Sequence, residues 1–317
     1  MNELETLSLH ALQVGNTSHD YEVVPNWAKI PDHVTLGYSH GIVVDEADRV
    51  YLFHTGRPSV VVFDRDGEYL NAWGEEFEGG AHGFYLHKEA GCEFLYVTDT
   101  AKRMMVKTTL TGEHLLTIGA PDVPDIYDDE RKFVPTDVAV APNGDIYIAD
   151  GYGQSWIHHY DALGNYIRSW GEKGKEDGQF NCPHGISIDV RRGEPEIYVA
   201  DRGNHRIQVF TLNGEFKRSF DHDMDMPCSF YFHKDEMYIP DLYSRVTVFD
   251  KHDRLVAHLG EDRQAKSQQG WPNVDKGYFR ANKFSSPHGI CVDSRGDVYV
   301  AEWISDGRLT KLKRKYG

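Results

Sequence analysis

The sequence predicts an all-β protein that forms a six-bladed β-propeller, and three observations carry this prediction. One phrase, close to P-H-G-I-x-x-D followed by a turn and V-Y-V-A-D, recurs six times along the 317 residues. The 30 Gly and 13 Pro are spread over the whole length, which indicates many tight turns. No segment sustains the 3.6-residue period of an amphipathic helix. Because a single blade cannot bury both of its faces, the copies are expected to stack into a ring.

Each copy is expected to form a four-stranded antiparallel meander. Its first two strands are clearest in CPHGISIDVRRGEPEIYVAD (182–201) and SPHGICVDSRGDVYVAE (286–302). A third strand and a hairpin turn follow most copies, as in RIQVFTLNGEFKRSF, where T-L-N-G-E joins two apolar runs. The blades are expected to start near residues 38, 80, 134, 182, 226 and 286.

The six copies are expected to make a single domain over residues 1–317, preceded by an N-terminal extension at 1–20. The last copy ends at TKLKRKYG, one strand short of a complete blade. The segment YEVVPNW (21–27) could supply the missing outer strand. We therefore predict that an N-terminal strand closes the ring.

Composition excludes several classes of function. There are 34 Lys and Arg against 50 Asp and Glu, a net charge of −16, which disfavours binding to nucleic acid. No apolar run is long enough to span a membrane. The N-terminus lacks the basic end and apolar run of a signal peptide, and the four Cys show no C-x-x-C spacing. We therefore expect a reduced, cytoplasmic protein that acts on a small molecule, and its oligomeric state is left open.

One position of the repeat indicates chemistry. The residue between Pro and Gly, which we call the slot residue, opens the innermost strand of each blade. It should therefore face the central channel. Blades two, four and six lie about a third of a turn apart, so their slot residues should converge on the axis. Three imidazoles with one side open are what a catalytic divalent metal needs. A mere turn consensus would not require His, because Thr and Cys occupy the same slot elsewhere. In chain order the slots hold His40, His82, Thr136, His184, Cys228 and His288.

We expect the metal ligands to be His82, His184 and His288, with His40 as a fourth ligand or a substrate contact. Zinc is the expected metal, although imidazole ligands suit several transition metals. An acid ends the second strand of most blades and is expected to bond backbone amides there. These acids are Asp99, Asp150, Asp201, Asp241 and Glu302.

Two less repetitive residues follow these acids, namely Tyr152 in ADGYG and Arg202 in ADRGN. Both should lie near the metal-bearing end of blades three and four. Insertions at 121–133, 172–181 and 261–283 precede inner strands, so they are expected to rim the site. The candidate substrate contacts on the rim are Arg57, Tyr127, Trp271, Tyr278, Phe279 and Arg280.

Taken together, these motifs resemble the NHL-repeat propellers and, within them, peptidyl-α-hydroxyglycine α-amidating lyase. The resemblance covers about residues 38 to 312 and is strongest over 135–157, 169–189, 199–210 and 286–293. In that family three histidines hold a catalytic zinc, and they match His82, His184 and His288. The family's essential Tyr and Arg match Tyr152 and Arg202.

The resemblance implies cleavage of a carbinolamide, an N–CH(OH) unit, into an amide and an aldehyde acid. Tyr152 would act as the base, which requires its pKa to fall well below about 10. Arg202 would favour the phenolate or hold a substrate carboxylate.

Three departures indicate a different substrate: Gly289 replaces the Asp of the family's calcium site, Thr55 replaces an Arg, and Ser286 replaces a Met. A structural calcium is therefore not expected. Two alternatives stay open: metal-dependent hydrolysis of an ester or lactone on the same site, and a non-enzymatic propeller that binds a partner.

Overall fold

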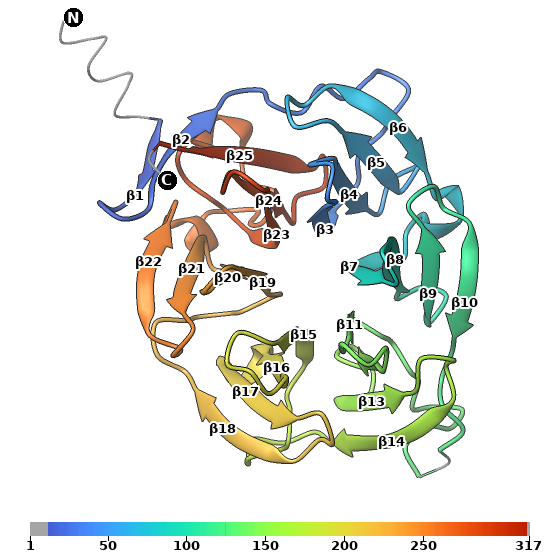
Figure 1. The fold of residues 1–317 in the computed structure, drawn as a ribbon. Coiled ribbons are helices and arrows are strands. Elements are labelled where there is room, and N and C mark those ends of the chain that lie inside the picture. Colours follow the sequence, from blue (N-terminus) through green and yellow to red (C-terminus); the bar gives the residue numbers. More distant parts are fainter. Residues whose placement is uncertain (1–11, 124, 316–317) are drawn as a thin grey trace, which may run out of the picture.

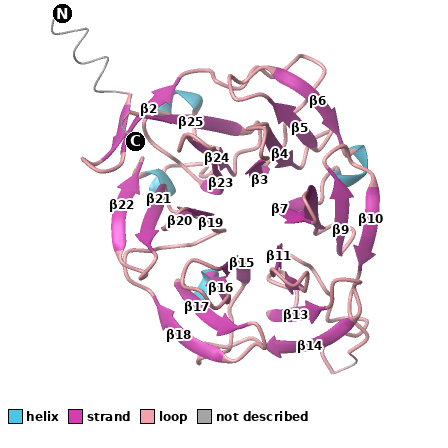
Figure 2. Cartoon of the chain, viewed as in Figure 1, coloured by secondary structure: helices cyan, strands magenta, loops and turns pink. Residues whose placement is uncertain are grey.

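The computed structural model describes residues 12–123 and 125–315, and it is a ring of six antiparallel sheets around a central channel (Figure 1). The prediction of a six-bladed β-propeller is confirmed. Strands and loops make up nearly the whole ring, and helix is confined to single 3-10 turns (Figure 2). These turns are Glu75–Phe77, Arg202–Asn204, Ala265–Ser267 and Lys276–Tyr278.

The first three blades run outward from the channel in chain order. Blade one comprises β3 (Ser39–Val44), β4 (Val50–His54), β5 (Val60–Phe63) and β6 (Tyr69–Trp73). Blade two comprises β7 (Ala81–Glu89), β8 (Cys92–Asp99), β9 (Met104–Thr109) and β10 (His114–Ile118). Blade three comprises β11 (Asp137–Val140), β12 (Ile146–Ala149), β13 (Trp156–Tyr160) and β14 (Tyr166–Gly171).

Blades four and five follow the same order, and blade six is completed from the other end of the chain. Blade four comprises β15 (Pro183–Asp189), β16 (Glu196–Asp201), β17 (Arg206–Thr211) and β18 (Phe216–Phe220). Blade five comprises β19 (Tyr231–His233), β20 (Glu236–Asp241), β21 (Arg245–Asp250) and β22 (Leu255–Leu259). Blade six comprises β23 (Pro287–Val292), β24 (Val298–Glu302) and β25 (Arg308–Arg314), then β2 (Asp20–Val24) and β1 (Gln13–Gly15).

An N-terminal strand closes the ring, as predicted. β2 pairs antiparallel with β25, so that Val23 lies opposite Leu312, and β1 adds a fifth strand outside it. This pairing gives the last blade the outer strand that the C-terminal segment lacks. The predicted extension at 1–20 contains β1 at its end, and its residues 1–11 lie outside the described residues.

The core lies between the blades, and each second strand contributes one fully buried tyrosine to it. Five of the six hydroxyls bond a carboxylate, and the hydroxyl of Tyr147 donates to the carbonyl of Leu212. This satisfies the polar end of each large ring while the rest of it packs. Within the described residues, no helix is long and apolar enough to cross a membrane. The six tyrosines are Tyr51, Tyr96, Tyr147, Tyr198, Tyr238 and Tyr299.

Candidate metal centre

The acids that end the second strands hold the segments that carry the slot residues. The Glu302 carboxylate accepts hydrogen bonds from the backbone N–H of Ser285 and Ser286, three and two residues before His288. The carboxylate of Asp241 does the same for the N–H of Asp225 and Met226, just before Cys228. Asp150 and Asp201 bind the corresponding backbone of blades three and four. The structural duty predicted for these acids is thus present in blades three to six, where it fixes the start of the inner strand. Asp99 of blade two instead accepts from the N–H of Lys102.

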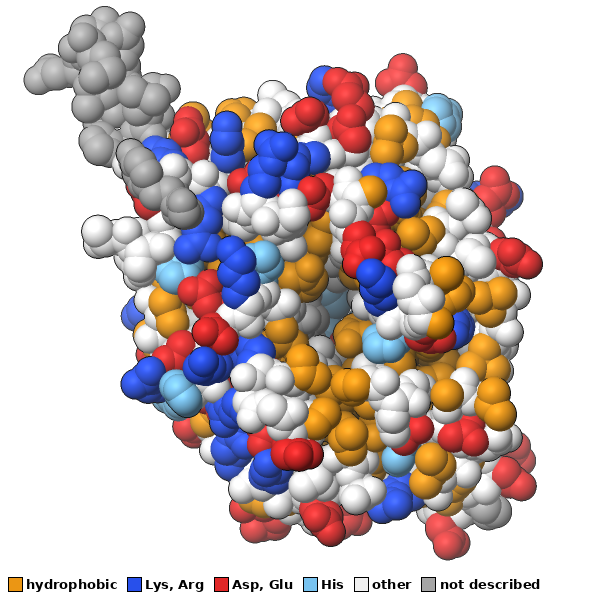
Figure 3. Space-filling view, in the orientation of Figure 1, with side chains coloured by type: hydrophobic (Ala, Val, Ile, Leu, Met, Phe, Trp, Pro, Cys, Tyr) orange, Lys and Arg blue, Asp and Glu red, His pale blue; other side chains and the backbone are white. Residues whose placement is uncertain are grey.

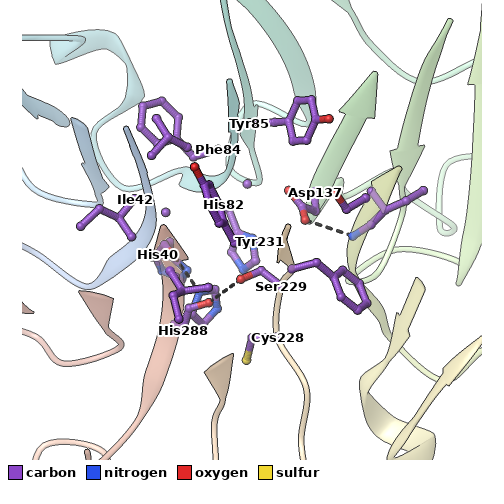
Figure 4. Close-up of a pocket in the computed structure, with 18 of the residues that line it drawn as sticks. His40, Ile42, His82, Phe84, Tyr85, Asp137, Cys228, Ser229, Tyr231 and His288 are labelled. Carbon is purple, nitrogen blue, oxygen red and sulfur yellow. Dashed lines mark hydrogen bonds between the residues drawn. The ribbon is translucent and has the colours of Figure 1, made fainter. Parts of the chain in front are cut away.

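The slot residues meet on the axis of the ring, where the inner strands open (Figure 4). Four imidazoles form a closed circuit, with ring centroids 4.4 Å apart for His40–His82 and 4.8 Å apart for His82–His184. The other two separations are 4.8 Å for His184–His288 and 4.7 Å for His288–His40. All four side chains are buried, and burial lowers their pKa values well below 6.5, that of His288 to about 3.

The imidazoles of blades two, four and six are oriented by the backbone of the next blade. Nδ1 of His82 lies 2.6 Å from the carbonyl of Thr136, and Nδ1 of His184 lies 2.8 Å from that of Cys228. Nδ1 of His288 lies 2.9 Å from the carbonyl of His40. A carbonyl only accepts, so Nδ1 carries the proton in each ring and Nε2 is left as an acceptor. Hydrogen bonds of this kind, made by the ring nitrogen that does not bind the metal, orient metal-ligating histidines in proteins.

The same contacts explain why glycine follows each of these histidines. A Cβ added at Gly185 would lie 2.3 Å from the carbonyl oxygen of Cys228, and one at Gly289 would lie 2.6 Å from that of His40. A Cβ at Gly83 would meet the carbonyl of Thr136 at 2.6 Å. The position of Gly289 therefore has no room for a larger side chain unless the neighbouring backbone shifts.

The odd-numbered blades place different groups in the slot. The Thr136 hydroxyl donates to backbone carbonyls of Ala149 and Pro183. Nδ1 of His40 is buried and has no hydrogen-bond partner among the described residues. Two sets of side chains bring one ligand atom each within 4.8 Å of one another, and His288 is in both sets. One set is His40, His82 and His288, and the other is His184, Cys228 and His288.

Tyr152 and Arg202 join the cluster from blades three and four. The Tyr152 hydroxyl lies 3.1 Å from Nε2 of His82 and 3.2 Å from Nε2 of His184, and Arg202 donates to it at 3.2 Å. Tyr152 as a whole residue is 44% exposed, whereas its hydroxyl points inward to these groups. Burial raises the pKa of Tyr152 above its ordinary value, and the Arg202 charge opposes this without reversing it. The polypeptide alone therefore does not produce the lowered pKa expected of a base.

The donor set fits a cation. The hydroxyl of Tyr152 has a single proton, which cannot satisfy the two Nε2 acceptors of His82 and His184 at once. A third Nε2, on His288, lines the same space. Three neutral imidazole acceptors that converge with too few donors match the requirements of a divalent transition metal. Among the described residues, the three-histidine group whose ligand atoms lie within 4.8 Å of one another is His40, His82 and His288, whereas His184 is grouped with Cys228 and His288.

Below the imidazoles the channel widens into a cavity of about 260 Å³. The centre of the face in Figure 3 is hollowed where the channel opens. Side chains of the inner strands line the cavity, most of them apolar, such as Ile42, Phe84 and Ile186. Asp137 is the one carboxylate among the described residues that line the cavity. It accepts a hydrogen bond from the N–H of Ile186, and burial raises its pKa to about 7.

The rim residues predicted from the loops lie in varied settings. The Tyr127 hydroxyl is engaged inside blade three by Asp150 and His158, so it is turned away from the axis. Arg57 forms ion pairs with Glu75 and Glu78. The Tyr278 hydroxyl donates to Asp262, and the Arg280 carbonyl accepts from Arg308. Their roles in substrate binding stay predictions.

Trp271 alone of the predicted rim residues joins a continuous aromatic row beside the site. Its indole N–H donates to the carbonyl of Ser285. Its ring centroid lies 6.3 Å from that of Trp303 and 5.8 Å from that of Tyr243. Trp303 in turn packs 5.3 Å from Tyr38, which precedes His40 by two residues. The sequence analysis missed these partners of Trp271, although two of them follow the acids of blades five and six, as Tyr152 and Arg202 do in blades three and four.

Comparison with known proteins agrees with this architecture. The NHL repeat family matches residues 134–160, 180–210 and 284–307. NHL repeat-containing protein 3 of Homo sapiens is 29% identical over 200 residues, which cover 60% of this chain and 56% of that protein. Peptidyl-alpha-hydroxyglycine alpha-amidating lyase 1 of Drosophila melanogaster is 30% identical over 233 residues, covering 60% of this chain and 40% of that protein. The chain thus spans less than two thirds of these relatives.

Among solved structures, a gluconolactonase from Xanthomonas campestris superposes with a TM-score of 0.62 at 14% identity, over 94% of this chain and 90% of that one. A streptogramin B lyase gives a TM-score of 0.60 at 12% identity, over 93% and 98% of the two chains. These two structures resemble this chain in fold only. The sequence matches confirm the predicted resemblance to NHL-repeat propellers and to the amidating lyases.

Proposed function

We propose that this chain is a metal-dependent lyase that cleaves the C–N bond of a carbinolamide, such as an N-acylated α-hydroxyglycine, into an amide and an aldehyde acid. The observation that carries the proposal is the contact of one phenol, Tyr152, with two of the converging imidazoles and with Arg202. Related enzymes named for α-hydroxyglycine lyase activity support it.

The metal would be held by His82, His184 and His288, with His40 beside them, and zinc is the ion we propose. When bound, a divalent ion supplies Lewis acidity, which lowers the pKa of a hydroxyl group. It also adds positive charge beside the Tyr152 hydroxyl, in the direction that the phenolate needs.

The reaction then requires one proton to move and no redox step. Tyr152 accepts the proton of the substrate hydroxyl while the C–N electron pair leaves with the nitrogen and the C–O bond becomes a carbonyl. The same proton returns from Tyr152 to the amide nitrogen, which balances the reaction. Arg202 is 3.2 Å from the phenol and has no carboxylate partner within the described chain, so it is placed to hold the carboxylate of the substrate.

The test is the turnover of an N-acyl-α-hydroxyglycine by wild type and Tyr152→Phe, with metal content measured by elemental mass spectrometry. We expect about 10²–10⁴-fold slower turnover in the variant, because general acid–base catalysis has this magnitude. We also expect the metal stoichiometry to be unchanged. Wild-type protein without stoichiometric metal, or a variant with full activity, would overturn the proposal. Incorporation of oxygen from labelled water into the carboxylic acid released from an ester or lactone would instead indicate the hydrolase, because an aldehyde acid exchanges its carbonyl oxygen with water without catalysis.

A further inference from the structure

Cys228 occupies the slot of blade five and lies among the donors of the metal centre (Figure 4). It is fully buried, and its ligand atom, with those of His184 and His288, forms a group within 4.8 Å. The thiol makes a long contact of 3.7 Å to the carbonyl of Met226. The Thr136 hydroxyl in the slot of blade three, by contrast, is fully used by two carbonyls.

The backbone of Cys228 also fixes the geometry of this group. Its carbonyl accepts the Nδ1–H of His184 at 2.8 Å. This bond links the imidazole of blade four to the residue of blade five that carries the sulfur. Gly185 permits this close approach, because a Cβ there would lie 2.3 Å from the same oxygen. The placement of the sulfur beside His184 is therefore built into the backbone.

Burial raises the pKa of the Cys228 thiol to about 12, and the charge of Arg202 opposes this without reversing it. The polypeptide alone therefore keeps the sulfur neutral, and a bound cation is what would bring it to the thiolate form. What favours ligation is the position of the sulfur beside His184 and His288.

We propose that Cys228 supplies a thiolate ligand to the same ion as His184 and His288. On binding, the thiol releases its proton to solvent and no electrons are transferred. A mixed thiolate and imidazole site selects a thiophilic ion such as Zn²⁺, Co²⁺ or Fe²⁺ over Mg²⁺ or Ca²⁺. This inference rests on the proposed metal centre and goes beyond it, because three histidines alone do not require sulfur.

The first test uses unmodified protein, so it does not depend on the stability of a variant. X-ray absorption of the zinc-loaded protein should show a sulfur neighbour at about 2.3 Å beside nitrogen neighbours at about 2.0 Å. A shell of nitrogen and oxygen alone would overturn the role of Cys228 and leave the metal centre standing. Absence of bound zinc would instead overturn the proposed function.

The second test compares two cysteine variants after loading with Co²⁺. Thiolate ligation gives a near-ultraviolet charge-transfer band, which we expect in wild type and in the control Cys182→Ser, whose sulfur also lies beside Arg202. We expect the band to vanish in Cys228→Ser. Circular dichroism of each variant checks that the propeller is folded. A band that persists in a folded Cys228→Ser variant would overturn the proposal.

Discussion

Blades two, four and six use the slot at the channel in one way, and blades one, three and five use it in another. The even blades point an imidazole at the axis and bond its Nδ1 to the carbonyl of the next slot residue. The odd blades supply those carbonyls, while their own side chains are diverse: His40, Thr136 and Cys228. The sequence repeat has six units, whereas the hydrogen bonding at the channel alternates with a period of two blades.

The difference shows which histidines are fixed in direction before any metal binds and which are not. A histidine held through Nδ1 has a fixed tautomer and direction, which lowers the reorganisation that metal binding requires. His40 has no such bond, since its Nδ1 is buried without a partner in the described part of the chain. Of the four imidazoles, His40 is therefore expected to contribute least to affinity.

The largest expected effect comes from removing one oriented imidazole. We expect His184→Ala to raise the Kd for Zn²⁺ by about 100-fold or more, equivalent to about 2.7 kcal/mol, and to abolish turnover. His40→Ala should raise it by about tenfold or less. Isothermal titration of metal-stripped proteins compares the two. Equal losses in both variants would show that the Nδ1 bond does not distinguish the even blades from the odd ones.

A smaller effect is expected from the glycine that lets two blades approach each other. Gly185→Ala would place a Cβ 2.3 Å from the Cys228 carbonyl, so the backbone that orients His184 must shift. We expect a loss of about 1–3 kcal/mol in the free energy of unfolding and a rise of about tenfold in the Kd for Zn²⁺.

Gly119→Ala is the matched control, because nothing lies within 4 Å of a Cβ added there. It should change the free energy of unfolding by less than about 0.5 kcal/mol. Denaturant unfolding and metal titration of both variants provide the measurements. If the metal affinity of Gly185→Ala matches that of the control, the glycine serves packing alone.

The sequence predicts the fold and the convergence of the slot residues because both follow from a repeat whose spacing can be counted. The alternation of the Nδ1 bonds is not visible there, since it depends on which backbone of the neighbouring blade comes within reach. Tyr127 shows a second limit. Its loop is correctly placed at the end of a blade, but its hydroxyl is captured by Asp150 and His158, and spacing cannot indicate such a contact.

The smallest expected effect concerns the residue after the slot, which is glycine in the even blades and Asp137 in blade three. Burial in the channel raises the pKa of Asp137 to about 7, so the folded state disfavours its charged form. The resulting destabilisation is absent below the unfolded pKa of about 3.9 and complete above about 7. Asp137→Asn keeps an oxygen for the N–H of Ile186 and removes the charge.

We therefore expect Asp137→Asn to be more stable than wild type by about 2 kcal/mol at pH 8 and by almost nothing at pH 4. The full difference between the folded and unfolded pKa values of Asp137 would give about 4 kcal/mol. We expect a smaller stability difference because the side chain is partly open to the channel. Urea unfolding from pH 4 to pH 8, with a chelator in both samples, isolates the carboxylate from metal binding. A stability difference that does not change with pH would mean that Asp137 has the same pKa in the folded channel as in the unfolded chain, so that it is ionised at neutral pH. Blade three would then place a negative charge in the channel beside the imidazoles, where it would attract a cation.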